Sequence, residues 1–418
     1  MKFTKISLIA AMLIGSSAFA IDNVKVSGDA NLYYQSENTD SNKIFNKDSS
    51  STDTSLNLNV TADLIKNDSV TVSGGAGYSV LSTLGLENNL VSKVWGGSHT
   101  ATIGNGSTYG NKVETANWVN EAWIAATSGK TTAKIGRMEL DTPLAFTEKW
   151  TIERNTFEAA MVVNQDIPNT TLVGGYIGNG NGTETNGQNL NSNVSNAGLA
   201  TAAVVNANGD FATYGTDGAY VAGIVNNSYK PLTAQAWYYD ITKVATAYWL
   251  QADLKMSGVS LGAQYSSTTK EGTNVNDDNV WAALLGYEMA NTSIALSYSS
   301  VNDNGSLGYA GANTATATGT AQTKLYTEAW WNYGQVTQTS TNSMHLTVES
   351  SVKDVADFGL YVTSIDHTSN NTNPDLTELT LTASKSLGNL DATLAYIHTN
   401  MKNNPVVNNV QAYLTYSF

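Results

Sequence analysis

The sequence contains no cysteine, which excludes a disulfide framework and thiolate chemistry. Proline is scarce, with 5 residues in 418, and charged residues make up only 13%, about half the usual share. After the first twenty positions there is no apolar run of about 18 residues, the length that a transmembrane helix needs. The 3.6-residue period of a soluble amphipathic helix is missing as well. These absences leave a chain of strands and polar loops.

Basic residues are also few, so the net charge is −14. Nucleic acids bind basic surfaces, and this balance disfavours a nucleic-acid partner. The first twenty residues, MKFTKISLIAAMLIGSSAFA, contain two lysines, a short apolar stretch and a final Ala-Phe-Ala. This pattern is typical of a signal peptide with a small-x-small cleavage site. We therefore expect residues 1–20 to be a signal peptide and residues 21–418 to form a single exported domain.

The main pattern in the sequence is an alternation of apolar and polar residues. In SLNLNVTADL (55–64) every second residue is apolar, which predicts a strand with one wet and one apolar face. The closing stretch, NNVQAYLTYSF, alternates in the same way and ends on Phe418. A strand at the very end of a chain needs a partner edge, and we expect it to pair with the first strand, at 24–34, so that both edges are removed.

The same unit recurs along the whole chain, separated by connections of two kinds. Short turns are expected at 65–68, 128–130, 165–168, 229–231, 255–258, 289–291, 353–356 and about 388. Longer polar connections are expected at 36–53, 81–116, 138–155, 179–218, 269–278, 302–341, 367–375 and 400–408, with one brief connection near 241–243.

This arrangement predicts an all-β fold of eighteen strands, with sixteen or twenty as alternatives. Short turns at one end and long loops at the other are typical of a transmembrane antiparallel β-barrel in the bacterial outer membrane, with periplasmic turns and extracellular loops. A soluble β-sandwich or propeller is the alternative, but it would not favour aromatic residues near the strand ends, where headgroups lie.

The segment 134–178 allows a more specific interpretation. Its strand ends in Ile135-Gly136-Arg137, a turn with Asp141-Thr142-Pro143 and a charged loop follow, and two strands are then joined through Ile167-Pro168. This segment resembles bacterial outer-membrane porins of the OprD type, and more closely the major outer membrane porins of campylobacter-type bacteria. The stretch KLYTEAWWNYG (324–334) is similar to that second group as well.

The resemblance implies an eighteen-stranded homotrimeric channel whose third loop, here about 138–155, folds into the lumen. OprD-type porins also carry a ladder of arginines on the barrel wall. This chain has nineteen lysines and only two arginines. It lacks such a ladder, so uptake of basic amino acids does not follow from the resemblance.

Both arginines bracket the third long connection, within the densest charge cluster of the sequence. Because guanidinium groups pair with carboxylates through two bonds at a time, we expect salt bridges to hold this loop across the lumen at the narrowest part of a pore. An exposed loop of chance composition is the alternative. The expected constriction residues are Arg137, Glu139, Asp141, Glu148, Lys149, Glu153, Arg154 and Glu158.

Catalytic and metal-binding patterns are not recognisable. His99, His345, His367 and His398 have no partners at metal-ligand spacing, and no Gly-x-Ser-x-Gly motif occurs. We expect no enzyme activity and no cofactor, although the acidic pair Asp277 and Asp278 could hold a hard cation such as Ca²⁺.

The sequence therefore predicts an outer-membrane porin, embedded in lipid, through which small hydrophilic solutes and ions diffuse passively. Five carboxylates against three basic groups in the cluster predict a weak preference for cations. The alternative function is an adhesin or structural surface protein that acts through the long loops at 179–218 and 302–341.

Overall fold

The computed structural model describes eight segments of the chain, which are residues 22–38, 43–82, 93–94, 116–149, 151–181, 211–315, 321–368 and 373–418. The signal peptide expected at 1–20 lies outside these residues, as do most of the connections at 81–116 and 179–218. Among the described residues, no helix is both long enough and apolar enough to cross a membrane.

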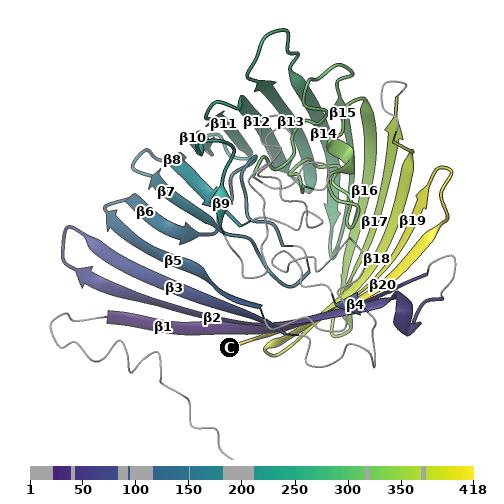
Figure 1. The fold of residues 1–418 in the computed structure, drawn as a ribbon, viewed down its shortest axis with the longest axis horizontal. Helices are drawn as coiled ribbons and strands as arrows, with labels where there is room; N and C mark the ends of the chain where they lie inside the picture. The colour runs from purple at the N-terminus through teal and green to yellow at the C-terminus, as the bar shows by residue number, and fades with distance from the viewer. Residues whose placement is uncertain are drawn as a thin grey trace, which may run out of the picture.

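The long strands form one antiparallel barrel that closes on itself (Figure 1). The sheet contains 20 strands, and without the two-residue strands β4 (Lys93–Val94) and β9 (Ala212–Thr213) the wall has the predicted 18. The wall strands are β1 (Asp22–Glu37), β2 (Ser50–Lys66), β3 (Thr71–Ser82), β5 (Ala116–Ser128), β6 (Thr131–Met138), β7 (Phe157–Asn164), β8 (Thr170–Gly180), β10 (Ala219–Asn226), β11 (Leu232–Ile241), β12 (Ala245–Met256), β13 (Val259–Lys270), β14 (Asp278–Met289), β15 (Thr292–Val301), β16 (Thr341–Val352), β17 (Ala356–His367), β18 (Leu376–Leu387), β19 (Leu390–Met401) and β20 (Val407–Ser417).

The last strand closes the barrel against the first, as the sequence predicts. β1 and β20 pair from Asp29 opposite Ser417 to Glu37 opposite Asn409. Beyond this pairing, the Phe418 and Gly28 backbones each donate to the other at 2.9 Å. A Cβ on Gly28 would clash with the backbone oxygen of Asn57 on β2 as well as with the Phe418 ring. Glycine is therefore required where the terminal aromatic ring crosses the first strand, and the closed sheet has no free edge.

Side chains alternate between the outer and inner faces of the wall. Leu296 and Leu381 are 47% and 45% exposed on the outer face, whereas Ser297 and Thr380 on the inner face are 2% and 0% exposed. These exposures confirm the predicted alternation at these positions, because successive side chains of a strand point to opposite faces of the sheet.

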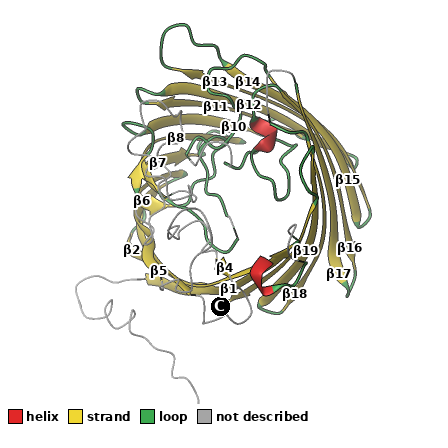
Figure 2. Ribbon diagram, turned by 45° about the vertical axis from the view of Figure 1, so that its right-hand side comes forward, coloured by secondary structure: helices red, strands yellow, loops and turns green. Residues whose placement is uncertain are grey.

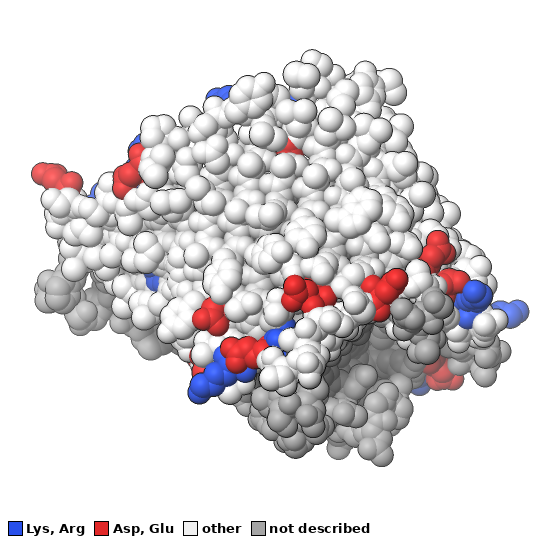
Figure 3. Space-filling model, turned by 90° about the horizontal axis from the view of Figure 1, so that it is seen from above, with Lys and Arg blue, Asp and Glu red and all other residues white. Residues whose placement is uncertain are grey.

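The outer face shown in Figure 3 is almost free of charge, and its acidic and basic side chains gather towards the edges. An uncharged band of this kind on the outer face is typical of a barrel wall that contacts the hydrocarbon of a bilayer. The height of the wall is uneven, because β6, β7 and β10 have only 8 residues each while many other strands have 12.

The ring of strands is not empty. Figure 2 shows loop segments and a short helix within it. That helix is η4 (Gln335–Thr337), and the other one, η1 (Lys47–Ser49), lies near β1. The largest apolar cluster contains inner-face residues of the wall together with Leu144 and Leu325 from two connections. The core of this protein thus lies between the inner face of the wall and the loops that pack on it.

Candidate functional site

The connection between β6 and β7, residues 139–156, is here called the third loop. It doubles back on itself twice, through isolated bridges between Asp141 and Phe146 and between Lys149 and Arg154. The backbone of Thr147 donates to Leu140 O at 2.8 Å, and the Glu148 backbone donates to Asn155 Oδ1 at 2.6 Å. These bonds satisfy backbone groups that would otherwise be buried without partners.

Two apolar side chains attach the third loop to opposite parts of the wall. Leu144 is fully buried in the large cluster, and its backbone N–H donates to the hydroxyl of Tyr239 on β11 at 3.2 Å. Ile152 packs instead with Tyr33 of β1 and Trp118 of β5. Because β11 and β1 lie far apart around the ring (Figure 1), the loop has anchors on two sides of the barrel.

Glu153 of the third loop is buried against β2. It is 3% exposed, and Asn57 Nδ2 donates to its Oε1 at 3.1 Å. Burial raises the pKa of this carboxyl group to about 7, although hydrogen bonds from Ser55 and Asn57 favour its charged form. Glu153 therefore changes its charge near neutral pH.

Glu148 joins the third loop to residues 302–340, which we call the seventh loop. The carboxylate of Glu148 is fully buried, and its Oε1 accepts from Asn313 Nδ2 and from the Gln322 backbone, each at 2.9 Å. Asn313 Nδ2 also donates to Phe146 O at 2.7 Å. The two loops thus form one hydrogen-bonded body.

The other charged groups of the third loop are more accessible. Arg154 pairs with Glu139 at 3.4 Å, and Asp141 pairs with Lys324 of the seventh loop. Lys149 is exposed to solvent but closely surrounded by protein, and this desolvation, followed by the nearby Arg154 charge, lowers its pKa. Six of the eight predicted residues, those from Glu139 to Arg154, therefore lie on the third loop. Four of them, Glu139, Lys149, Glu153 and Arg154, line one cavity.

Arg137 and Glu158 do not belong to this group. They pair with each other at 2.9 Å, opposite one another on β6 and β7. Their neighbours Met138 and Phe157 belong to the inner cluster, so alternation points the ion pair to the outer face. Asn179 Nδ2 also donates to Glu158, at 2.6 Å, and the Phe211 ring lies 4.1 Å from the Arg137 guanidinium carbon. The expectation that these two residues line the constriction is therefore corrected.

The seventh loop is the part of the site that the sequence reasoning missed. The sequence predicts a long polar connection suited to surface contacts, whereas much of its described part packs against the inner face of the wall. Glu378 of β18 is 1% exposed and accepts the backbone N–H of Trp331 at 3.1 Å and of Asn332 at 2.8 Å. The Tyr326 backbone donates to Gln264 of β13 at 3.0 Å. The Trp-Trp pair and the single Glu within KLYTEAWWNYG were the only sequence signals of burial.

A polar cavity of about 300 Å³ separates the third loop from the wall. Among the residues that line it, the amides of Asn31, Asn57 and Asn120 outnumber apolar groups. Its charged lining is unbalanced, with five carboxylates from Asp29, Glu121, Glu139, Glu153 and Asp391 against two basic groups, Lys149 and Arg154.

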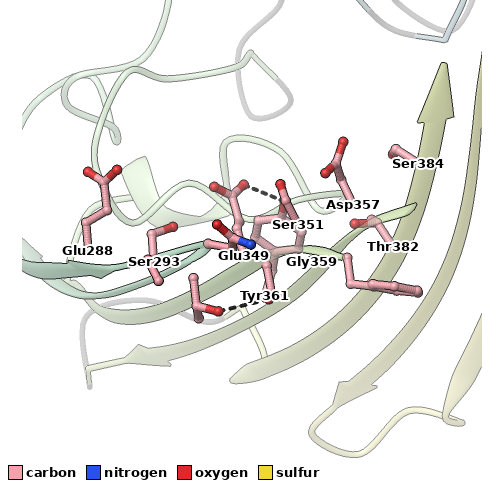
Figure 4. A pocket seen from close by; sticks show the side chains of 14 residues that line it. Glu288, Ser293, Glu349, Ser351, Asp357, Gly359, Tyr361, Thr382 and Ser384 are labelled. Atoms are coloured by element: carbon pink, nitrogen blue, oxygen red, sulfur yellow. Dashed lines mark hydrogen bonds between the residues drawn. The ribbon is translucent and has the colours of Figure 1, made fainter. Parts of the chain in front are cut away.

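A second polar cavity, of about 550 Å³, lies where β14–β18 approach the short turns (Figure 4). Glu288, Glu349 and Asp357 contribute its acidic groups, and the Tyr361 hydroxyl donates to Glu349 at 2.8 Å. The inner surface therefore carries acidic groups at two levels along the barrel axis, one beside the third loop and one near the short turns.

The acidic pair that could hold a hard cation is engaged in hydrogen bonds within the protein. Asp278 accepts the backbone N–H groups of Leu307 at 2.8 Å and Gly308 at 3.0 Å, while Asp277 accepts from the Thr269 hydroxyl at 2.7 Å. In the described part of the chain, no three His, Asp or Glu side chains are grouped to hold a metal ion. Three of the histidines bond to Thr or Asn side chains, and His99 lies outside the described residues.

Comparisons with known proteins agree with this architecture. Residues 7–326 match the family model described as Gram-negative porin. The fold is similar to OpdK of Pseudomonas aeruginosa, solved with vanillate, at 13% identity and a TM-score of 0.70, covering 95% of this chain and 98% of that one. OccK9 (OpdG) of the same organism has the same values, and OccAB4 of Acinetobacter baumannii gives 13% identity, a TM-score of 0.69, and coverage of 94% and 98%. The chain matches none of the curated proteins. The resemblance to OprD-type porins is confirmed.

Proposed function

Because the chain belongs to the Gram-negative porin family, we propose that it is a passive outer-membrane channel for small hydrophilic solutes and ions. The observation that carries this proposal is the polar cavity between the third loop and the wall of a closed 18-stranded barrel. In this proposal the chain is exported, and the signal peptide at 1–20 is removed.

The proposed constriction is formed by the third loop, which crosses the lumen with its anchors on β11 and β1. Six residues of this loop contribute charge there, and Arg137 and Glu158 do not, because they lie on the outer face. The seventh loop forms the other side of the constriction, held to the third through Glu148 and Lys324. The six residues are Glu139, Asp141, Glu148, Lys149, Glu153 and Arg154.

We propose that the channel has a weak preference for cations. Five carboxylates and two basic groups line the cavity, and a narrow space with low-dielectric walls concentrates the field of such an imbalance. Rings of Asp and Glu side chains select cations in channels by the same effect.

Planar bilayers test both parts of this function. The purified barrel should form steady conductances, and reversal potentials in a KCl gradient should show preference for K⁺. The double variant Glu139→Gln with Asp391→Asn should reduce that preference, because it removes two of the five cavity carboxylates. Asp217→Asn is the matched control, since Asp217 pairs with Lys243 in a loop away from the cavity. An anion preference in the wild type would contradict the proposed selectivity.

The alternative role as an adhesin or structural surface protein is weakened. It depended on the long connections at 179–218 and 302–341. The described part of the second of these packs inside the barrel, where Thr327 and Val336 are fully buried. Residues 309–315 and 321–340 of this connection are therefore not available as an extended surface loop.

We also propose that the channel is a homotrimer and that its subunits meet over the outer face of β6 and β7. Strands of 8 residues at the usual tilt reach about 20 Å, which is less than the apolar band of about 25 Å in such barrels. The Arg137–Glu158 pair also lies on this face, and charged groups facing lipid destabilise a barrel. A second copy of the chain would cover both features.

A further inference from the structure

A pocket at the extracellular end of the barrel is separate from the proposed constriction. It has a volume of about 470 Å³ and lies between the ends of β1, β19 and β20 and the seventh loop. Trp331 of that loop lines it, together with Met401, Pro405 and Val406. Its polar lining includes Glu37 at the end of β1 and Asn409 on β20.

The position of Trp331 is fixed from two directions. Its backbone is held by the buried Glu378 carboxylate, and its side chain packs against the cluster that contains Tyr33 and Ile152. Ile152 belongs to the third loop, so the pocket adjoins the proposed constriction. A solute bound here would be held at the entrance, before the narrowest part of the channel.

The side-chain amides in the polar lining of the pocket are engaged within the protein. Asn38 Nδ2 donates to Val406 O at 3.3 Å, and Asn404 Nδ2 donates to Lys402 O at 3.2 Å. Asn332 Nδ2 donates to Glu378 at 2.7 Å and to Thr399 at 3.0 Å. Each of these amide groups therefore uses at least one of its two donors within the protein.

Acceptors, in contrast, are left over. Asn409 is 3% exposed and donates to Gln35 at 3.3 Å, but its enclosed Oδ1 accepts no hydrogen bond from the described residues. An unsatisfied buried acceptor is costly, so a bound donor would be favoured. Glu37 adds a carboxylate that forms no ion pair within the segments the structure describes. Among the described residues, no Lys or Arg lines the pocket.

We propose that this pocket binds the ammonium group of an organic cation with a short apolar body. The geometry combines a tryptophan ring, the aromatic surface that attracts cations most strongly, with a carboxylate and an unpaired amide oxygen. Met401, Pro405 and Val406 provide the apolar surface for the rest of the solute. The inference rests on the proposed channel function, and it names the class of solute that this channel collects at its entrance.

Calorimetric titration of the purified barrel in detergent at pH 7 tests the pocket directly. Benzylammonium should bind at least about tenfold more tightly than benzyl alcohol or benzoate, which have the same ring without the positive charge. Glu37→Gln should weaken benzylammonium binding by about tenfold. Equal binding of the three probes, or no binding of benzylammonium, would overturn the proposal.

Substitutions of Trp331 provide a second test of the pocket. Affinity should fall in the order Trp331, Trp331→Phe, Trp331→Leu, because the cation–ring attraction weakens in that order. Trp281→Leu is the matched control, since Trp281 is 48% exposed on the outer face of β14. Each variant is first checked for a heat-modifiable gel shift, which shows that the barrel has folded. Unchanged affinity in folded Trp331→Leu would refute the site.

Conductance separates this proposal from the channel function on which it rests. Benzylammonium should block K⁺ current through the wild type, and Trp331→Leu should relieve that block. Steady conductance without benzylammonium binding would refute the pocket alone. Binding without any conductance would refute the channel function and the role of the pocket as its entrance.

Discussion

At the scale of single residues, Glu153 is expected to make the channel sensitive to pH. Burial raises its pKa from 4.5 to about 7, so the folded chain keeps this proton between those two values while the unfolded chain loses it. As pH rises through 7 the group becomes charged, which removes stability and adds a negative charge beside the cavity. Cation preference should therefore increase between pH 6 and pH 8, measured as reversal potential in a KCl gradient.

Two variants decide whether Glu153 is the group responsible. Glu153→Gln keeps the shape and the neutral state, so its selectivity should be flat across this range. Glu139→Gln removes a more exposed carboxylate from the same cavity and should keep the slope. A slope that survives in Glu153→Gln would assign the titration to another residue.

Arg137 shows why single residues were harder to predict than strands. It lies two positions before the third loop in sequence, so sequence proximity alone groups it with the charges of that loop. The face to which a side chain points depends on register, and one position of difference reverses it. Gly136 adds a local distortion, with a φ of 127° and no room for a Cβ, which would lie 2.1 Å from Ala122 O. The sequence did not contain the information to assign this residue to one face.

At the scale of elements, the seventh loop should depend on the carboxylate of Glu378. That group accepts two backbone N–H groups and the Asn332 side chain in a site that is 1% exposed. Glu378→Ala would leave these donors buried without a partner, at a cost of about 1–3 kcal/mol. We expect lower stability in denaturant titrations and noisier single-channel currents, because the loop loses its attachment to β18.

Glu349→Ala is the control for this loss. Glu349 also faces the lumen, from β16, but its hydrogen-bond partner is Tyr361 rather than a loop. It should alter current noise much less than Glu378→Ala. Quiet currents in Glu378→Ala would show that other contacts, such as Tyr326 with Gln264, are enough to hold the loop.

The elements themselves were predicted well where the signal was local. Strand positions follow from alternation, and short turns follow from polar interruptions of two to five residues, so all eight predicted turns separate wall strands. The seventh loop was different, because its contacts join residues far apart in sequence, such as Asn313 with Phe146. Its Ala, Gly and Thr residues are as suitable for an exposed loop as for a packed one.

At the scale of the whole molecule, the absence of cysteine allows the proposed trimer contact to be mapped with single labels. Ile135 on β6 and Leu285 on β14 are 64% and 58% exposed on the outer face of one chain. If subunits meet over β6 and β7, a fluorophore on Ile135→Cys should be shielded from brominated lipid, while one on Leu285→Cys should be quenched. The position of the short strands and of the Arg137–Glu158 pair is the reason for this expectation.

The same labelled samples give an independent measure of assembly. Their mass in detergent should correspond to three chains, and Arg137→Leu should lower it, because Glu158 would then be left as an unpaired charge within the contact. The double variant Arg137→Leu with Glu158→Leu should assemble better than the single one, since the uncompensated carboxylate is gone. If both labelled positions are quenched equally and the particle in detergent has the mass of one chain, lipid rather than a second copy covers the wall at the short strands β6 and β7.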